Sequence, residues 1–307
     1  MKDKFVQIED KNLLMVLNKT LLGVECLNNI TESDIEKIDV LDAANSNIYS
    51  LKGLEYAVNL ERLDLSENQI EDISSLSRLV SLQKLDLSFN TIKDVSPLRH
   101  LLNLKHLSLD NNIISDIKYL EGLTNLQILT LSHNDITDIS NLKRMIHLEL
   151  LAINCNKISN IVPVGFLRHL EILRANDNNI EDVLGLKYLK HLLELELNGN
   201  KVRDISPLKD LISLECIELN GNGLKDVKPI EEIFYLSRLS LINNDIEDIS
   251  PLADLTNLVE LKLSNNSIKD VSPIKNLTNL LALDLSGNRI EDKDLLKDLI
   301  YLEELKL

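Results

Sequence analysis

One asparagine recurs at a constant interval along most of this 307-residue chain, and this regularity limits what the chain can fold into. The interval is 22 residues at every step through Asn68, Asn90, Asn112, Asn134, Asn156, Asn178, Asn200, Asn222, Asn244, Asn266 and Asn288. A unit this short cannot bury an apolar face alone, so it must stack on its neighbours and share a core with them. The interval therefore predicts one elongated solenoid that grows turn by turn, rather than several separate globular domains.

The apolar residues within one turn indicate how the chain runs. Before Asn68, the alternation of Leu63 and Leu65 with polar residues has a period of two, which predicts a short strand. Apolar residues then follow at about every third position as far as Leu82, which favours a compact return segment over a free amphipathic helix. We expect successive strands to pair as a parallel sheet. The asparagine side chain both donates and accepts, so we expect it to satisfy main-chain groups at the bend after each strand.

The return segment has its own signature. All six prolines occupy one repeat position, and a serine often precedes them, as in Ser96-Pro97. This order predicts a helical turn with the serine as N-cap and the proline at the first helical position. An aspartate such as Asp94 stands two residues before the serine position in ten of eleven repeats, and Asn160 replaces it in the other. Calcium needs six to eight oxygens that converge on one point, so a line of single carboxylates favours local turn capping instead.

These residues, I-x-D-[IV]-x-P-L joined to L-x-x-L-x-L-x-x-N, resemble the 22-residue class of leucine-rich repeats. Internalins of bacterial surfaces carry this class, as does a eukaryotic nuclear regulatory subunit of protein phosphatase 1. The resemblance covers residues 38–307, and residues 30–56 also resemble the N-terminal caps of internalin-like proteins, which favours a bacterial relative. It implies a curved α/β solenoid, or horseshoe, with a parallel β-sheet on the concave face and short 3-10 or turn returns on the convex face. It also implies a non-enzymatic protein that binds a partner protein on the concave strand face.

The expected organisation is a helical N-terminal cap over residues 1–37 and a solenoid over residues 38–307. The solenoid would contain eleven regular repeats, a degenerate first repeat and an incomplete last one. In the cap, Leu13 and Leu17 share one helical face that Gly23 ends, and residues 31–34 have the pattern of a capping box. The last residues, 301–307, begin another strand, whose open edge would either be continued by further chain or pair with another molecule. We favour the first of these.

Charge and cysteine usage narrow the partners and the compartment. The net charge of −16 argues against nucleic acid and against an anionic membrane surface, and it favours a basic partner or simply solubility. No apolar run approaches a membrane span. Cys26, Cys155 and Cys216 match no metal motif, and we expect no disulfide. Thiols without a leader predict a cytoplasmic protein, whereas the resemblance implies secretion or the cell surface if a leader precedes this sequence.

The candidate partner-binding residues are those that point outward from the strands. Six positions before the asparagine, Ile128, Leu150 and Ile172 are consecutive apolar members of one column, which predicts an exposed apolar stripe. The other candidates are Thr130, Ala152, Arg174, Phe89, His133, Cys155 and His106. The charged rim would consist of Arg62, Lys84 and Arg174 on one side and Glu194, Glu196 and Glu218 on the other. The alternative is that isoleucine and leucine are simply common in strands, where single exposed apolar residues are ordinary.

Other functions are less well supported by the sequence. His147, His169 and His191 form a column, which suggests hydrogen bonding at a turn. The alternative is a zinc site, but a closed zinc site needs four ligands and this column supplies only three. No catalytic constellation appears, so we expect no enzyme activity, no cofactor and no metal. The alternative functions are a structural, self-assembling repeat protein that associates through its C-terminal edge, or a regulatory subunit of an enzyme such as a phosphatase. We expect a monomer.

Overall fold

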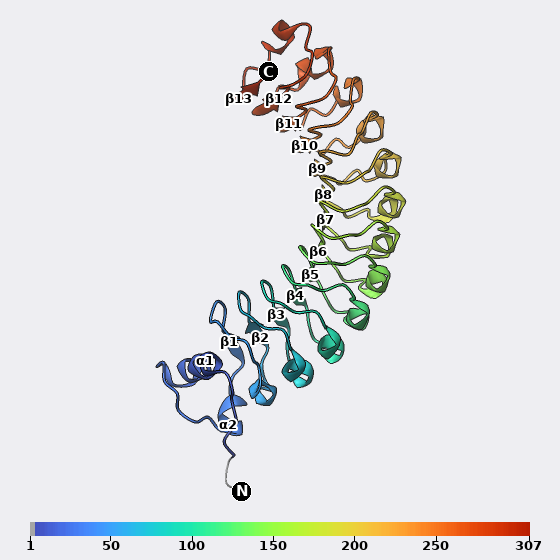
Figure 1. Cartoon of the computed structure of the whole chain (residues 1–307). Helices are drawn as coiled ribbons and strands as arrows, with labels where there is room; N and C mark the ends of the chain where they lie inside the picture. Colours follow the sequence, from blue (N-terminus) through green and yellow to red (C-terminus); the bar gives the residue numbers. More distant parts are fainter. Residues whose placement is uncertain (1–3) are drawn as a thin grey trace. The chain divides into compact units, whose positions relative to one another are not determined.

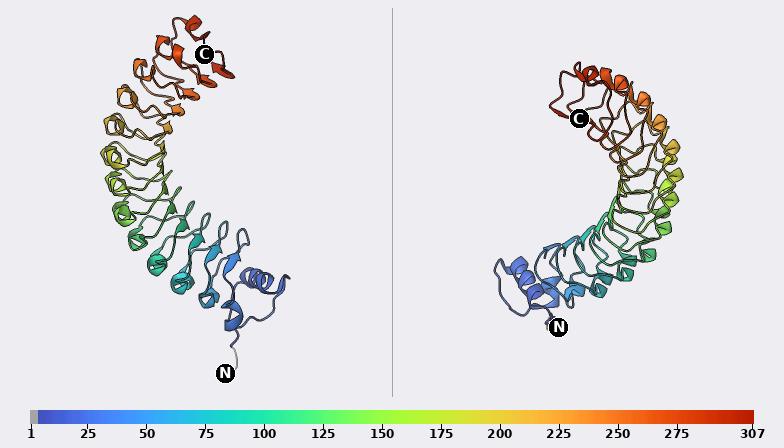
Figure 2. Two further views of the ribbon diagram at one scale, coloured as in Figure 1. Left: turned by 180° about the vertical axis from the view of Figure 1, so that it is seen from behind. Right: turned by 45° about the horizontal axis from the view of Figure 1, so that its top comes forward.

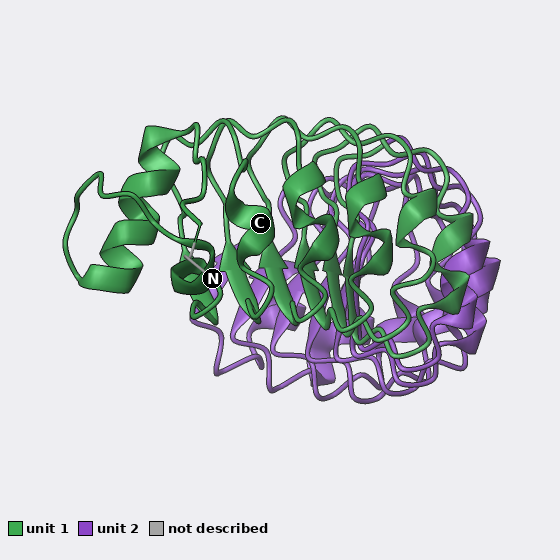
Figure 3. Cartoon of the chain, turned by 90° about the horizontal axis from the view of Figure 1, so that it is seen from below, with its two compact units in different colours: residues 1–156 green, residues 157–307 purple. Residues whose placement is uncertain are grey.

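A computed structural model describes residues 4–307, which contain two short α-helices followed by a regular alternation of three-residue strands and 3-10 helices (Figure 1). The chain divides into two compact units (Figure 3). The first unit ends at Asn156, and the second begins at Lys157 and ends at Leu307. The first three residues of the predicted cap lie outside the described residues.

The first unit begins with helices α1 (Lys11–Leu22) and α2 (Glu32–Ile35). Asp10 caps α1 by accepting hydrogen bonds from the backbone N–H groups of Asn12 and Leu13, and Gly23 ends the helix with a φ of 73°. The other carboxylate oxygen of Asp10 accepts from the N–H groups of Tyr49 and Ser50, so this buried side chain joins the helix to the first turn of the solenoid. The capping box predicted at residues 31–34 is confirmed at the start of α2.

Parallel strands and 3-10 helices alternate through the rest of the first unit. The strands are β1 (Val40–Asp42), β2 (Arg62–Asp64), β3 (Lys84–Asp86), β4 (His106–Ser108), β5 (Ile128–Thr130) and β6 (Leu150–Ala152). The 3-10 helices are η1 (Leu54–Tyr56), η2 (Ser74–Arg78), η3 (Ser96–His100), η4 (Lys118–Leu120) and η5 (Ser140–Arg144). Each strand pairs with the next in a register of 22 residues, so equivalent side chains of neighbouring repeats lie side by side.

The second unit continues the same alternation from residue 157. Its strands are β7 (Ile172–Arg174), β8 (Glu194–Glu196), β9 (Cys216–Glu218), β10 (Arg238–Ser240), β11 (Glu260–Lys262), β12 (Ala282–Asp284) and β13 (Glu304–Lys306). Its 3-10 helices are η6 (Val162–Phe166), η7 (Leu184–Tyr188), η8 (Ser206–Leu208), η9 (Lys228–Ile230), η10 (Ser250–Leu252), η11 (Ser272–Asn276) and η12 (Lys293–Leu296). Within each unit the strands line the inner side of the curve and the 3-10 helices line the outer side (Figure 2). The predicted leucine-rich-repeat solenoid is confirmed.

The repeated asparagines join each turn to its neighbours, as the sequence predicted. Asn90 Nδ2 donates to the carbonyl oxygens of Leu65, Leu87 and Ser88 at 2.9–3.1 Å. Its Oδ1 accepts from the N–H of Ile70 at 3.0 Å, and the residue is buried. One side chain therefore satisfies main-chain groups of two turns at the bend where the strand ladder stops, beside a core of leucine and isoleucine columns.

The serine cap predicted for the return segment is wrong. In η3 the N-cap position holds Val95, whose side chain is buried in the core, while Ser96 and Pro97 are the first two helical residues. Asp94 makes the capping bonds: its Oδ1 accepts from the Ser96 N–H at 2.8 Å, and its Oδ2 accepts from the Ser96 hydroxyl at 2.8 Å. The core needs an apolar side chain at the N-cap position, so the residue before it supplies the carboxylate. The predicted aspartate capping is thus confirmed.

Candidate functional site

The sheet register brings the predicted stripe residues of the first unit together. His106, Ile128 and Leu150 are direct neighbours on β4, β5 and β6. Ile128 and Leu150 are half-buried rather than fully exposed, and Ala152 is only 7% exposed. The expected stripe is therefore only partly exposed, because neighbouring side chains in the sheet cover part of it. We call Ile128 and Leu150 the apolar floor of the first unit. Thr130 lies in register with Ala152 and donates to the Ser108 hydroxyl at 3.1 Å.

In the second unit, the remaining stripe residue and its basic neighbour lie on β7. Ile172 is half-buried and lies in register with Glu194, while Arg174 lies in register with Glu196. The Arg174 guanidinium contacts Glu194 Oε1 at 2.8 Å through Nη2 and Glu196 Oε1 at 3.0 Å through Nε. The predicted basic rim residue is therefore held by the acidic residues that the sequence had placed on the opposite rim.

Contacts within this ion-pair network shift the pKa values of its members. The hydrogen bond from Arg174 to Glu194 raises the pKa of the arginine. Burial raises the pKa of Glu194, but hydrogen bonds from Arg174 and Glu196 outweigh it, so the pKa of Glu194 is lowered overall. Burial and the contact with Glu194 raise the pKa of Glu196. The pKa values of two neighbouring carboxyl groups are thus shifted in opposite directions beside one cation.

The residue before each repeated asparagine adopts a left-handed backbone conformation. In the first unit this position holds Glu67, Phe89, Asn111, His133 and Cys155, with φ values of 52–56°. In the second unit it holds Asp177, Gly199, Gly221, Asn243, Asn265 and Gly287. Glycine, asparagine, aspartate and histidine adopt this conformation most readily, whereas other residues are strained in it by about 1 kcal/mol or more. The first unit thus keeps costly residues at Glu67, Phe89 and Cys155 along one ridge, and Phe89 is 54% exposed.

The sequence analysis selected Phe89, His133 and Cys155 for their position but missed the backbone that carries them. The signal was available, because three glycines and two asparagines occupy the same column later in the chain. A residue that resists the left-handed conformation, at a position where the repeat otherwise chooses glycine or asparagine, needs an explanation other than folding.

A second asparagine ladder, also missed, lies on the strand face of the second unit. Asn176 Oδ1 accepts from the Asn198 N–H, and Asn198 Oδ1 accepts from the Asn220 N–H, both at 2.8 Å. The amide groups also hold carboxylates, because Asn176 Nδ2 donates to Glu196 and Asn198 Nδ2 donates to Glu218. The sequence could have predicted this ladder, because consecutive repeats carry a further asparagine two positions before the repeated asparagine. These bonds fix the acidic side chains on the strand face.

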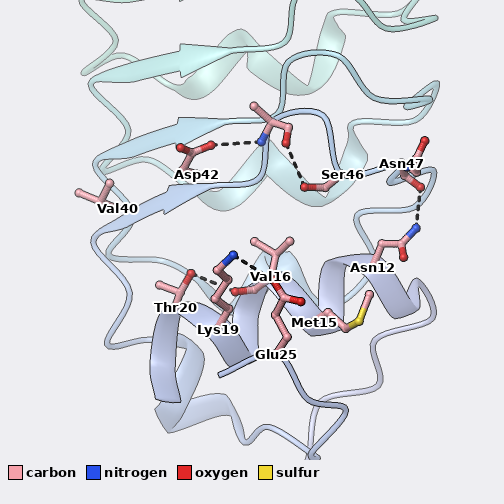
Figure 4. A pocket seen from close by; sticks show the side chains of 11 residues that line it. Asn12, Met15, Val16, Lys19, Thr20, Glu25, Val40, Asp42, Ser46 and Asn47 are labelled. Carbon is pink, nitrogen blue, oxygen red and sulfur yellow. Dashed lines mark hydrogen bonds and ion pairs between the residues drawn. The ribbon is translucent and has the colours of Figure 1, made fainter. Parts of the chain in front are cut away.

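A pocket of about 720 Å³ lies between α1 and β1, in the first unit (Figure 4). Lys19 and Glu25 form an ion pair at 2.9 Å across one wall, and Asn12 Nδ2 donates to the Asn47 carbonyl at another. Val40 and Asp42 contribute the strand side. The described residues that line this pocket include no histidine or cysteine, so it does not combine a nucleophile with a neighbouring imidazole base.

The histidine column and the cysteines show no sign of a metal centre. The rings of His169 and His191 stack with centroids 6.2 Å apart. Within residues 4–307, no group of three or more histidine, cysteine, aspartate or glutamate side chains is arranged to hold a metal ion. No disulfide joins cysteines in this part of the chain. Among the helices described, none has the length and apolar character needed to cross a lipid bilayer.

Comparisons with known proteins agree with this geometry. Leucine-rich-repeat families match residues 40–92, 80–123, 122–139, 236–276 and 256–301. An internalin of Listeria monocytogenes, InlF, is 32% identical and aligns over 97% of this chain and 95% of its own with a TM-score of 0.86. The chain belongs to the internalin family.

Other solved structures extend the comparison for this internalin. Internalin C2 of Listeria monocytogenes is 35% identical over 68% of this chain and 96% of its own, with a TM-score of 0.63. A plant peptide hormone receptor, RGFR1, solved in complex with RGF2, is 22% identical and shares the fold with a TM-score of 0.78. It aligns over 90% of this chain and 48% of its own. A search among proteins of curated function gave no match.

Proposed function

We propose that this internalin is a non-enzymatic interaction scaffold that binds a partner protein on its strand face. The observation that carries the proposal is the strained ridge of the first unit. Phe89, His133 and Cys155 occupy a left-handed position that holds asparagine at Asn111 and only glycine, asparagine or aspartate in the second unit. Selection for folding alone would favour those residues in every repeat, so the costly side chains of Phe89 and Cys155 are retained for contact with another molecule.

The floor beside this ridge supports the same role. Ile128 and Leu150 form adjacent half-buried apolar positions in register, with His106 next to them on β4. Protein interfaces place apolar residues at the centre of a polar rim, and exposed aromatic side chains such as Phe89 often supply the anchor. The net charge of −16 favours a basic partner, because long-range attraction accelerates its approach.

The comparisons add support by analogy. The plant receptor solved in complex with RGF2 has the same fold, so a leucine-rich-repeat solenoid of this kind is suited to holding a ligand. For this internalin the partner would be a protein. Ile172 and Arg174 of the second unit remain candidate contacts, to be tested separately from the first unit.

The test is a cross-linked pull-down from the source cell and its surroundings, followed by measurement of affinity for whatever partner is recovered. We expect Ile128→Glu/Leu150→Glu to abolish recovery, because two carboxylates would have to be desolvated in the apolar floor. The control is Ala282→Glu, which places one carboxylate in the same half-buried column of the second unit. Equal recovery by the double variant and the native chain would discard the first-unit floor as the binding surface.

A second variant separates binding from folding. Phe89→Asn places in the strained position a residue that Asn111 and Asn243 show to be compatible with it. We expect this variant to be at least as stable as the native chain and to bind the recovered partner more weakly. A stabilised variant with unchanged affinity would remove the strain argument from the proposal.

Self-association is a second candidate function, favoured by one observation. Ile300 is 75% exposed, Tyr301 is also exposed, and Leu305 is an exposed residue of β13. Exposed apolar side chains gathered in this way can pack against a second copy. Light scattering over a range of concentrations decides this: a monomer at all concentrations rules it out, and an oligomer that Leu305→Lys dissolves supports it.

A further inference from the structure

The outer side of the second unit carries an apolar cluster that departs from the rest of the repeats. Val162 and Phe166 of η6 and Leu184 and Tyr188 of η7 are 44–54% exposed. Six positions after the asparagine, the second unit otherwise has Ser206, Lys228, Ser250, Ser272 and Asp294. Ten positions after it, the second unit otherwise has Asp210, Glu232, Asp254, Asn276 and Asp298. Two consecutive repeats thus replace polar residues with large apolar ones at both positions.

Paired glycines bring these two helices into close contact. A Cβ on Gly165 would lie 2.7 Å from the carbonyl oxygen of Gly185, and a Cβ on Gly185 would lie 3.0 Å from the Cα of Val162. Neither glycine needs its conformational freedom, because neither has a positive φ. They are needed for space. Glycine at both places therefore lets η6 and η7 approach until their exposed side chains, here called the convex cluster (Val162, Phe166, Leu184 and Tyr188), form one surface.

Two cations border the convex cluster. The Arg168 guanidinium lies 4.5 Å from the centroid of the Tyr188 ring, and its Nη1 donates to the Tyr188 carbonyl at 3.0 Å. Lys187 Nζ lies 4.9 Å from the same ring. Both contacts hold positive charge at the edge of the apolar surface, in a chain whose net charge is −16. The two side chains that border Tyr188 are thus opposite in sign to the net charge of the whole molecule.

We propose that the convex cluster is a docking site for a short linear segment of a partner protein, in which apolar side chains are flanked by carboxylates. The apolar side chains would cover Phe166 and Tyr188, and the carboxylates would pair with Arg168 and Lys187. This site lies on the outer side of its unit, whereas the proposed strand-face function uses the inner side, so the two can fail independently.

Size and charge favour a linear segment over a second copy of this chain. A stable protein pair usually buries about 800 Å² on each partner, far more than four half-exposed side chains supply. A second copy joined through the same cluster would also bring two sets of Arg168 and Lys187 together. A short acidic and apolar segment has neither difficulty.

The test is a selection of short linear peptides from a displayed random library on the full chain, with counter-selection on Phe166→Ser/Tyr188→Ser. The two replaced residues are half-exposed, so we expect the double variant to fold, which circular dichroism checks. Enriched peptides should combine aromatic or aliphatic residues with aspartate or glutamate. Fluorescence anisotropy with such a peptide should show a loss of affinity of roughly tenfold or more in the double variant.

Matched variants make the result specific. Ile212→Ser/Phe234→Ser removes two equally exposed apolar side chains from the turns before β9 and β10, and the affinity should be unchanged. Arg168→Gln/Lys187→Gln should weaken the binding of acidic peptides and abolish the salt dependence of that binding. The proposal is overturned if no peptide prefers the native chain over Phe166→Ser/Tyr188→Ser, or if the enriched peptides are basic. It is also overturned if sedimentation shows a dimer that this double variant dissociates.

Discussion

Replacement of Asn156 by leucine tests the central claim about the repeat. Asn156 Oδ1 accepts from the Ile136 N–H at 2.9 Å, and its Nδ2 donates to the Leu131 carbonyl at 2.9 Å. The Asn134 amide also donates to the Leu131 carbonyl, so that oxygen would keep one partner after the substitution. The buried N–H of Ile136 would lose the partner that this side chain provides.

The expected loss can be worked from these bonds. A buried donor without a partner costs about 1–3 kcal/mol, and each net hydrogen bond lost elsewhere costs about 1 kcal/mol. The Asn156 amide group also donates to the carbonyls of Ile153 and Asn154. The leucine adds some apolar burial that offsets part of this. We therefore expect Asn156→Leu to reduce the free energy of unfolding by about 3–5 kcal/mol.

Urea unfolding followed by circular dichroism measures this change, and amide hydrogen exchange locates it. The Ile136 amide should exchange much faster in the variant, because the local turn opens without unfolding the distant repeats. Asn179→Leu is the matched control, since Asn179 is exposed and follows another repeated asparagine. An unchanged urea midpoint together with retained protection at Ile136 would refute the proposed role of the ladder.

Three further predictions concern strain, burial and capping. Glu67→Asn should raise the free energy of unfolding by about 0.5–1 kcal/mol, because asparagine tolerates the φ of 56° at this position; a urea midpoint that stays constant or falls contradicts this. Burial raises the pKa of the Cys216 thiol to about 11, so a thiol reagent at pH 8 should modify it slowly in the folded chain and rapidly in urea, while the other two cysteines react in both states. Asp270 accepts hydrogen bonds from the N–H and the hydroxyl of Ser272, and both lower the pKa of its carboxyl group, the N–H bond more than the hydroxyl bond. The stabilising effect of this carboxylate is therefore fully present above its unfolded pKa of 3.8, and it disappears as the pH falls through the folded pKa. An NMR titration should show the pKa of Asp270 rising only part of the way in Ser272→Ala, because the N–H bond remains, and a full return to the ordinary value would contradict that ranking.

The fold was predictable from the sequence because the same pattern of apolar residues and asparagine recurs in every repeat. The alternation of Leu63 and Leu65 predicted β2, and the donor and acceptor groups of asparagine predicted the ladder. The cap of the return segment was mispredicted because proline and serine resemble a standard helix start. The position before them must be apolar to reach the core, and this moves the capping role to Asp94.

The candidate site was less predictable, because its properties depend on neighbours in space. The column of Ile128 and Leu150 follows from spacing, but their partial burial depends on the side chains of the adjacent strands. The pairing of Arg174 with Glu194 and Glu196 needed the geometry of long side chains, which spacing does not give. The contact between Gly165 and Gly185 is likewise visible only when two repeats are stacked.

A repeat protein offers its own standard for deciding which residues serve a partner. Every position has equivalents in other turns under nearly the same packing, so a residue that raises the free energy of the fold stands out against its equivalents. Phe89 stands out on the strand side because its equivalents include glycine and asparagine, and Phe166 stands out on the outer side because its equivalents include aspartate and glutamate. The two departures differ in kind, since one strains the backbone and the other exposes apolar surface. Two separate contacts explain them more simply than one, because a partner confined to the inner side of the strands gives no reason for the glycine pair behind them.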